Sequence, residues 1–195
     1  MAFLRASAAN DAGPVVAGNG VRLRTPALAD FGEWAALRAE SRDFLTPWEP
    51  LWPADDLTRN AFRRRIRRYQ MEIRDDQAYP FFIIRGSDKA LVGGITLSSV
   101  TRGMTQSATI GYWIGQRFAN QGHMSRALRA IVPFAFDSLH LHRVEAACLA
   151  HNVPSLRLLE GAGFIREGIA RGLVCINGRW QDHIVLALLT TDPRP

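Results

Sequence analysis

The chain has 195 residues, of which 47% are hydrophobic and 22% charged. This composition is typical of one ordered globular domain and unlike that of a disordered or fibrous chain. The formal net charge of +6 is carried almost wholly by arginine, since Lys89 is the only lysine, and it favours an anionic partner such as a polyphosphate cofactor or RNA. The two cysteines lack metal-ligand spacing, and no apolar run reaches the length of a membrane span. We therefore expect no metal, no membrane contact and a cytoplasmic location.

The first third of the chain is predicted to contain a tail, a strand, a helix and a loop. Residues 1–19 mix small, polar and charged residues and are expected to form a flexible tail before a single domain over residues 20–192. Alternation predicts a strand over residues 21–24, and apolar spacing predicts a helix over residues 28–39. Three prolines rule out a regular helix in residues 44–53.

An arginine-rich helix is predicted next. Asp55 and Asp56 are candidates for its N-cap, and its apolar positions step by three and four residues up to Ile73. The run from Arg63 to Arg68 lies mostly off this stripe. Such runs usually form a solvated face, and a contact with RNA or the ribosome is the alternative.

The remainder is predicted to alternate strands with two helices. Gly86 to Lys89 and Asn177-Gly178 are hairpin signals. The predicted strands cover residues 79–85, 90–100, 106–115, 143–149, 163–176 and 180–189, and the helices cover residues 122–139 and 154–161. The strand–helix–strand unit of residues 106–149 should be a right-handed parallel crossover. The predicted class is α/β, or α+β in the stricter sense: a mixed, mostly antiparallel central sheet with helices on both faces and one parallel βαβ crossover.

A candidate anion site lies where the crossover strand leads into its helix. The connecting loop reads Ala119-Asn120-Gln121-Gly122-His123-Met124. A helix start offers unpaired N–H groups and a positive dipole end, which together bind anions. Gly122 lets the backbone approach a ligand closely.

A second segment makes this signal specific. The strand of residues 143–149 is followed by His151-Asn152-Val153-Pro154-Ser155 and then by Gly163-Phe164. In this order and spacing the two segments resemble the GCN5-related N-acetyltransferase (GNAT) superfamily. There the loop binds the CoA pyrophosphate and the later segment holds the pantetheine arm. Residues 44–50, 111–115 and 177–183 are similar to the RimJ/RimL branch, the RimJ type above all, whose members acetylate the N-terminal alanine of a small-subunit ribosomal protein.

The resemblance covers residues 21–191 and implies the roles of individual residues. Ser155 is the candidate acid at the CoA sulfur, with helix capping as its alternative role. Glu49 and His183 are the candidate bases, and Asp182 is an alternative to His183 that would act through water. The implied acceptor-binding residues are Trp48, Glu49, Tyr112 and Trp180. The implied acetyl-CoA-binding residues are Trp113, Ile114, Ala119, Asn120, Gln121, Gly122, His123, Met124, Ser125, Asn152 and Ser155.

Four positions depart from the superfamily pattern. Ala119 stands in place of a Gln or Arg, and Met124 in place of the closing Gly or Ala, so backbone amides rather than side chains must hold the pyrophosphate. Leu159 stands where many relatives carry a tyrosine acid, and Thr109 where many carry a glutamate base. The missing glutamate matters less for a peptide α-amine, because its pKa of about 7.7–8.0 leaves roughly a tenth of it neutral at pH 7.

The sequence therefore predicts direct transfer of an acetyl group from acetyl-CoA to the N-terminal amine of a ribosomal protein. The enzyme is expected to be a monomer or a dimer. Two alternatives remain open: a GNAT enzyme that acetylates a small-molecule amine, and a ribosome-assembly factor that retains the fold.

Overall fold

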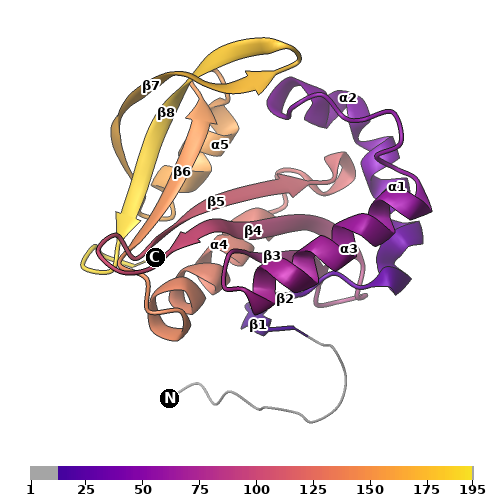
Figure 1. Cartoon of the computed structure of the whole chain (residues 1–195), viewed down its shortest axis with the longest axis horizontal. Helices are drawn as coiled ribbons and strands as arrows, with labels where there is room; N and C mark the ends of the chain where they lie inside the picture. Colours follow the sequence, from indigo (N-terminus) through magenta and orange to yellow (C-terminus); the bar gives the residue numbers. More distant parts are fainter. Residues whose placement is uncertain (1–12, 195) are drawn as a thin grey trace.

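An eight-stranded sheet in the order β1-β2-β3-β4-β5-β6-β8-β7 forms the centre of the computed structural model, which describes residues 13–194 (Figure 1). Its strands are β1 (Val15–Gly18), β2 (Val21–Arg24), β3 (Tyr79–Arg85), β4 (Leu91–Thr101), β5 (Ser107–Ile114), β6 (Arg143–Leu149), β7 (Ile165–Ile176) and β8 (Arg179–Leu189). The β5–β6 pair is parallel and the other pairs are antiparallel. The predicted mixed sheet is confirmed. Strand β1, paired with β2, falls within the predicted tail, whose first twelve residues lie outside the described part.

Helices cover both faces of this sheet, as predicted (Figure 1). The helices are α1 (Phe31–Glu40), α2 (Arg42–Leu45), α3 (Arg59–Arg74), α4 (His123–Pro133), which continues as a π-helix over Phe134–Ser138, and α5 (Val153–Glu160). Short 3-10 helices cover Leu28–Asp30, Thr46–Trp48 and Gln116–Phe118. On one face α1 packs on α3, with the Trp34 and Phe62 ring centroids 4.7 Å apart. On the other face the ring of Phe134, just after α4, meets the edges of Tyr79 and Phe81 on β3.

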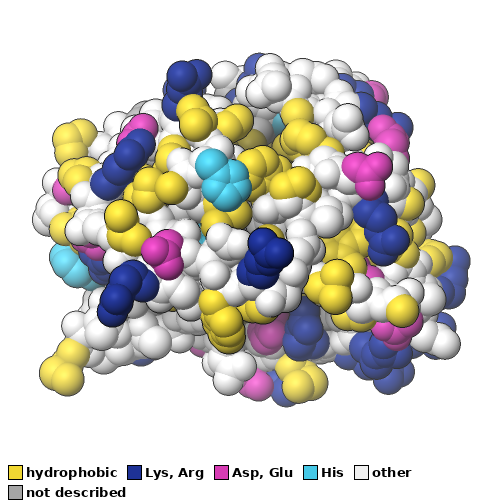
Figure 2. All heavy atoms as spheres, turned by 90° about the horizontal axis from the view of Figure 1, so that it is seen from above, with side chains coloured by type: hydrophobic (Ala, Val, Ile, Leu, Met, Phe, Trp, Pro, Cys, Tyr) yellow, Lys and Arg dark blue, Asp and Glu magenta, His cyan; other side chains and the backbone are white. Residues whose placement is uncertain are grey.

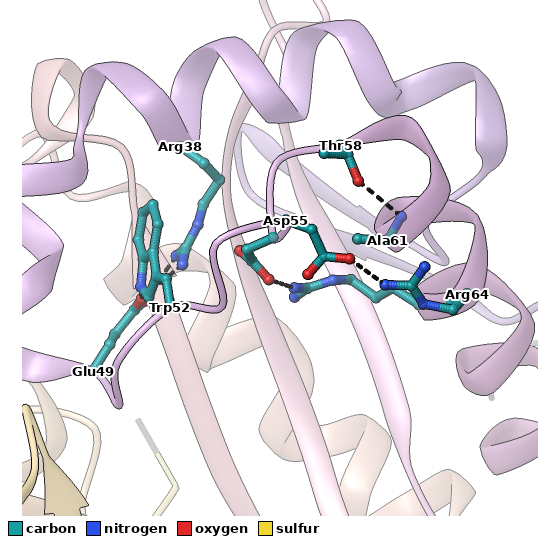
Figure 3. A network of polar contacts seen from close by, with 9 residues as sticks. Arg38, Glu49, Trp52, Asp55, Thr58, Ala61 and Arg64 are labelled. Atoms are coloured by element: carbon teal, nitrogen blue, oxygen red, sulfur yellow. Dashed lines mark hydrogen bonds and ion pairs between the residues drawn. The ribbon is translucent and has the colours of Figure 1, made fainter.

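The segment before α3 departs from the prediction in two ways. Helical turns are present after all: α2 ends at Leu45, and a 3-10 turn follows with Pro47 near its start, where a missing N–H costs no hydrogen bond. The N-cap of α3 is Thr58, whose Oγ1 accepts the N–H of Ala61 at 3.2 Å (Figure 3). Neither Asp55 nor Asp56 caps the helix, because their carboxylates bind arginines of α3 instead.

Most of the arginine run on α3 has partners within the chain. Arg64 binds Asp55 and Arg65 binds Asp56, each at 2.5 Å, and Arg68 lies 3.4 Å from Glu72. Arg65 also stacks on the Trp34 ring at 5.1 Å. Within residues 13–194, Arg63 and Arg67 form no ion pair. These contacts support the solvated-face interpretation of the run.

The sheet divides between β5 and β6. These strands pair only through Ser107, Ala108 and Thr109 of β5 with Arg143, Val144 and Glu145 of β6. Beyond Thr109, β5 continues to Ile114 against β4 alone, while β6 continues to Leu149 against β8. The two strands therefore diverge toward their C-terminal ends and leave backbone groups between them without a sheet partner.

Candidate active site

A cavity of about 580 Å³ occupies the divergence of β5 and β6. Residues 110–114 of β5 form one wall and residues 146–149 of β6 form the other. The starts of α4 and α5 and the segment around Trp48 close the remaining sides. Its volume lies within the range of about 300–1,000 Å³ that is usual for pockets of small molecules and cofactors.

Two backbone amides of β5 point into this cavity. The N–H of Gly115 donates to the carbonyl of Val92 on β4 at 2.9 Å. Backbone groups alternate in direction along an antiparallel strand, so the N–H groups of Tyr112 and Ile114 point away from β4 and toward the gap. The same alternation turns the N–H of Trp113 toward β4. Trp113 thus meets the cavity through its side chain, and Tyr112 and Ile114 supply the free donors.

The loop before α4 forms an anion-binding nest. Asn120 and Gly122 both have left-handed backbones, with φ of 58° and 75°. The first helical bond runs from the N–H of Arg126 to the carbonyl of Gly122 at 3.1 Å. The N–H groups of the three residues in between, His123, Met124 and Ser125, consequently have no acceptor inside the helix. Converging N–H groups at a positive helix end suit a pyrophosphate.

Side chains of this loop mostly hold the loop itself. Gln121 donates to the carbonyl of Arg117 at 2.7 Å, is exposed, and does not line the cavity. Arg117 binds Glu40 at 3.2 Å, while Arg126 donates to the carbonyl of Gln121 at 3.2 Å. Arg126, in the first turn of α4, therefore stays next to the nest without an acidic partner among the described residues. Ala119, Asn120 and Ser125 line the cavity.

His123 is buried at the start of α4. Burial lowers the pKa of its imidazole, and the nearby Arg126 and Arg85 lower it further. Its Nδ1 faces Nη1 of Arg126 at 3.5 Å, and its Nε2 has no partner within the described residues. The side chain is thus held neutral beside a site suited to an anion.

A pair of hydroxyl groups lies in the middle of the cavity. The Asn152 side chain accepts the N–H of Ser155 at 3.3 Å and caps α5. The Ser155 hydroxyl is 2.7 Å from the Tyr112 hydroxyl, which joins α5 to β5 across the cleft. Burial raises the pKa of the Tyr112 phenol well above its usual value. Burial likewise raises the pKa of the Cys148 thiol on the cavity wall. All these hydroxyl and thiol groups therefore keep their protons at neutral pH.

Glu49 is the carboxylate at the other end of the cavity, and it is held by three donors (Figure 3). Arg38 on α1 donates to its two oxygens at 2.8 and 2.7 Å, and the Trp52 indole donates to Oε2 at 2.7 Å. The Arg38 guanidinium also lies over the rings of Trp52 and Trp113, at 4.0 and 4.9 Å. The charge of Glu49 is thus compensated, and Oε1 retains a free lone pair.

His183 on β8 is buried and lines the cavity. Its Nδ1 is 2.9 Å from the carbonyl oxygen of Gln181. A carbonyl only accepts hydrogen bonds, so Nδ1 carries a proton, and in the neutral form of the ring the lone pair lies on Nε2. This tautomer is the one that a proton acceptor requires.

The two tryptophans of the predicted acceptor wall lie in different places. Trp48 lines the cavity and its ring is 5.4 Å from that of His151. Trp180 is 72% exposed and does not line the cavity.

Within residues 13–194 no helix is long and apolar enough to cross a membrane, and no group of three or more His, Cys, Asp or Glu side chains is placed to hold a metal ion.

Comparison with known proteins identifies the family of the chain. The acetyltransferase (GNAT) domain family matches residues 21–165. The chain belongs to the GNAT acetyltransferase family. It is 40% identical over 175 residues to a Bacillus subtilis (strain 168) protein described as "Probable N-acetyltransferase YjcK", covering 90% of this chain and 97% of the relative. It is 33% identical over 182 residues to the [ribosomal protein uS5]-alanine N-acetyltransferase of Escherichia coli (strain K12), covering 90% and 94%.

A solved structure extends the similarity. Mycobacterium smegmatis RimJ in complex with CoA-disulfide is 28% identical to this GNAT chain, with a TM-score of 0.84 over 91% of this chain and 86% of the other. The predicted fold and family are thus confirmed.

Sequence reasoning missed two features of this GNAT site. Arg38 follows Leu37 on the buried side of α1, and a lone arginine among apolar positions was its only signal. The bond between Tyr112 and Ser155 joins residues 43 positions apart, so no local pattern marks it. It turns Tyr112 from an expected wall of the acceptor site into a partner of the candidate acid.

Proposed function

We propose that this GNAT acetyltransferase transfers the acetyl group of acetyl-CoA to the N-terminal α-amine of a ribosomal protein, with alanine as the first residue. Its similarity to the uS5-alanine N-acetyltransferase over 90% of the chain supports this acceptor. The observation that carries the proposal is the charge of the acceptor end. Glu49 is the only acidic residue that lines the cavity within residues 13–194, and Arg38 compensates it.

This charge balance favours an amine that is already partly neutral. A peptide α-amine has a pKa of about 7.7–8.0, whereas a lysine or polyamine nitrogen lies near 10.4. A fully protonated amine would require a free carboxylate to bind it and a strong base to deprotonate it. Among the described residues, the acceptor end of the cavity offers the compensated Glu49 and the imidazole of His183, which suits an α-amine.

The residues are placed for direct transfer. As the amine nitrogen forms its bond to the thioester carbon, its proton passes to Nε2 of His183, directly or through a water held by Glu49. Negative charge grows on the thioester oxygen and is met by a free N–H of β5, from Tyr112 or Ile114. The carbon–sulfur bond then breaks, and Ser155 donates its proton to the sulfur. Tyr112 replaces that proton and is itself reprotonated from solvent, while His183 releases the amine proton to solvent.

Donor binding uses the opposite end of the cavity. The nest formed by residues 120–125 suits the pyrophosphate, and Arg126 adds positive charge. The side-chain oxygen of Asn152 caps α5, and its NH₂ group is available to donate to the pantetheine arm. Its capping and ligand-binding roles are therefore compatible. Acetyl-CoA supplies the activated acetyl group, and the protein supplies position and proton transfer.

Two alternative functions can be tested in the same assay. A small-molecule amine acetyltransferase for polyamines would require uncompensated carboxylates, which the cavity wall lacks among the described residues. A ribosome-assembly role would use Arg63 and Arg67 on α3, and it is compatible with catalysis.

The experiment measures CoA thiol release with acetyl-CoA and a panel of acceptors. The panel contains peptides that begin with Ala, Ser or Met, an N-terminally blocked peptide with an internal lysine, and polyamines. We expect turnover on the free α-amine peptides, highest for alanine. Turnover on polyamines alone would refute the peptide acceptor, and CoA binding without turnover on any amine would favour the non-enzymatic role.

A further inference from the structure

A second cavity of about 400 Å³ adjoins the acceptor end of the first. It lies between the turn of the β7–β8 hairpin, the end of β6 and the 3-10 turn at Pro47. Its lining is mostly polar and contains no acidic residue: Pro47, Leu149, His151, Ile176, Asn177, Arg179 and Gln181. The catalytic steps proposed above use none of these side chains.

Contacts between neighbouring residues join the two cavities into one path. Leu149 lines both of them. The ring of Trp48 in the first cavity packs on that of His151 in the second at 5.4 Å. His183 in the first is hydrogen-bonded to the carbonyl of Gln181 in the second. A chain whose N-terminus lies at His183 can therefore leave the reaction centre along the second cavity.

The hairpin turn fixes the outer wall of this path. Asn177 and Gly178 both have left-handed backbones, with φ of 48° and 77°, as a tight hairpin turn requires. The Asn177 side chain donates to the carbonyl of Thr46 at 3.1 Å and ties the turn to the loop opposite. Arg179, the first residue of β8, is thereby held at the wall rather than on a free end.

The positive charge of Arg179 is unpaired in the described part of the chain. Arg179 takes part in no ion pair or side-chain hydrogen bond within residues 13–194. The nearest acidic residue along β8, Asp182, accepts the N–H of Gly172 at 2.8 Å on the neighbouring strand. Figure 2 shows the end of the molecule that lies at the top of Figure 1, where apolar side chains gather beside a histidine and side chains of both charges stand around them. Within the second cavity itself, Arg179 is the charged lining residue among those described, and it suits an acidic partner better than a basic one.

We propose that the second cavity binds the segment of the acceptor protein that follows the acetylated residue, and that Arg179 selects an acidic side chain in that segment. This inference rests on the proposed function. Arg179 lies four residues before His183 on β8, which is about 13 Å at roughly 3.3 Å per residue. An extended acceptor advances about 3.3–3.6 Å per residue. Allowing for the reach of the arginine, the acidic side chain belongs at the third to fifth residue of the acceptor.

The test is a series of Ala-initiated octapeptides with Glu, Gln or Lys at position 3, 4 or 5. The value of kcat/KM is measured by thiol release for the native protein, for Arg179→Glu and for the matched control Arg171→Glu. Arg171 lies on β7 of the same hairpin, is exposed and lines neither cavity. We expect the native protein to prefer Glu over Gln by about fivefold at one of these positions, as for a partly exposed ion pair, and the preference to shrink with salt.

The variants then decide the assignment. Arg179→Glu should reverse the order so that Lys is preferred, while Arg171→Glu should keep the native order. Equal turnover on Glu, Gln and Lys peptides by the native protein would overturn this inference and leave the proposed function standing. An equal effect of both variants would also overturn it, because general surface charge would then be the cause. No turnover on any peptide would overturn the proposed function and this inference together.

Discussion

Replacing Tyr112 by phenylalanine removes one oxygen from the active site and keeps the aromatic ring. In the native protein this hydroxyl is 2.7 Å from that of Ser155, the proposed proton donor to the sulfur. Burial raises the pKa of the phenol, so Tyr112 remains protonated, and able to donate, beyond pH 10. If Tyr112 acts by supplying and orienting the Ser155 proton, its loss should slow the chemical step and leave donor binding nearly unchanged.

The size of the effect follows from the bond that is lost. A neutral hydrogen bond contributes about 0.5–1.5 kcal/mol, and about 1.4 kcal/mol corresponds to a factor of ten. Tyr112→Phe should therefore lower kcat by roughly two- to twelvefold. Ser155→Ala should cost more, about a hundredfold or less, because a thiol leaving group of pKa about 8.5 requires only modest acid assistance. The double variant should be no slower than Ser155→Ala, since Tyr112 acts through Ser155.

The assay combines kcat from thiol release, the CoA dissociation constant from calorimetry, and Tm. Tyr79→Phe is a matched control, because the Tyr79 hydroxyl binds Asp76 at the same 2.7 Å but lines neither cavity. It should lower Tm by a few degrees, about 2–4 °C per kcal/mol, and leave kcat unchanged. A double variant whose loss equals the product of the single losses would refute the reasoning, because Tyr112 would then act independently of Ser155. A fall of native kcat below pH 10 that Tyr112→Phe abolishes would refute the assigned pKa direction.

Three further variants test the other parts of the site. Gly122→Ala places a side chain on a backbone with a φ of 75°, which costs about 1–2 kcal/mol unless the loop changes its conformation. Because that change would turn the N–H groups of the nest away from the pyrophosphate, CoA binding measured by calorimetry should weaken about tenfold. Gly32→Ala, with nothing within 4 Å of the added carbon, should leave CoA binding unchanged. Arg38→Met leaves the Glu49 carboxylate without its cation and should cost about 3 kcal/mol in chemical denaturation; an unchanged midpoint would contradict the role of this pair. His183→Gln should lower kcat/KM about a hundredfold at pH 7, and the loss should shrink toward pH 9, where the α-amine is already neutral; equal losses at both pH values would rule out a base.

Local patterns allowed much of this fold to be predicted from the sequence. The Asn177-Gly178 hairpin is specified by two residues that tolerate left-handed backbones, and both adopt them. Strand β1 was missed because Val15–Gly18 is only four residues long and buries none of them fully. The N-cap of α3 was misassigned because three capping residues lie within four positions. Asp55 and Asp56 bind Arg64 and Arg65, which lie more than one turn into the helix, and no local sequence pattern indicates this pairing.

In the candidate site, too, local patterns predict some features, and others depend on contacts between distant residues. Loop residues 119–125 and Asn152 follow a spacing along the chain, so a local pattern was enough to predict a donor end for the site. The acceptor end depends on contacts between distant elements. Glu49 was expected as a base, yet its bonds to Arg38 and Trp52 show an anchored carboxylate with one free lone pair. The lone pair of His183 likewise depends on a backbone carbonyl whose direction no side-chain pattern encodes.

The short seam between β5 and β6 has a consequence for the lifetime of the protein. Among the described strands, three residue pairs are the only strand pairing that links the β1–β5 half-sheet to the β6–β8 half-sheet. A donor molecule that touches β5 on one side and α5 on the other fastens the halves together. At a hundred times its dissociation constant, a ligand stabilises the native state by about 2.7 kcal/mol. Amide protons along the seam should then exchange more slowly and proteases should cut less often, so the supply of acetyl donor would govern how long each enzyme molecule survives as well as how fast it works.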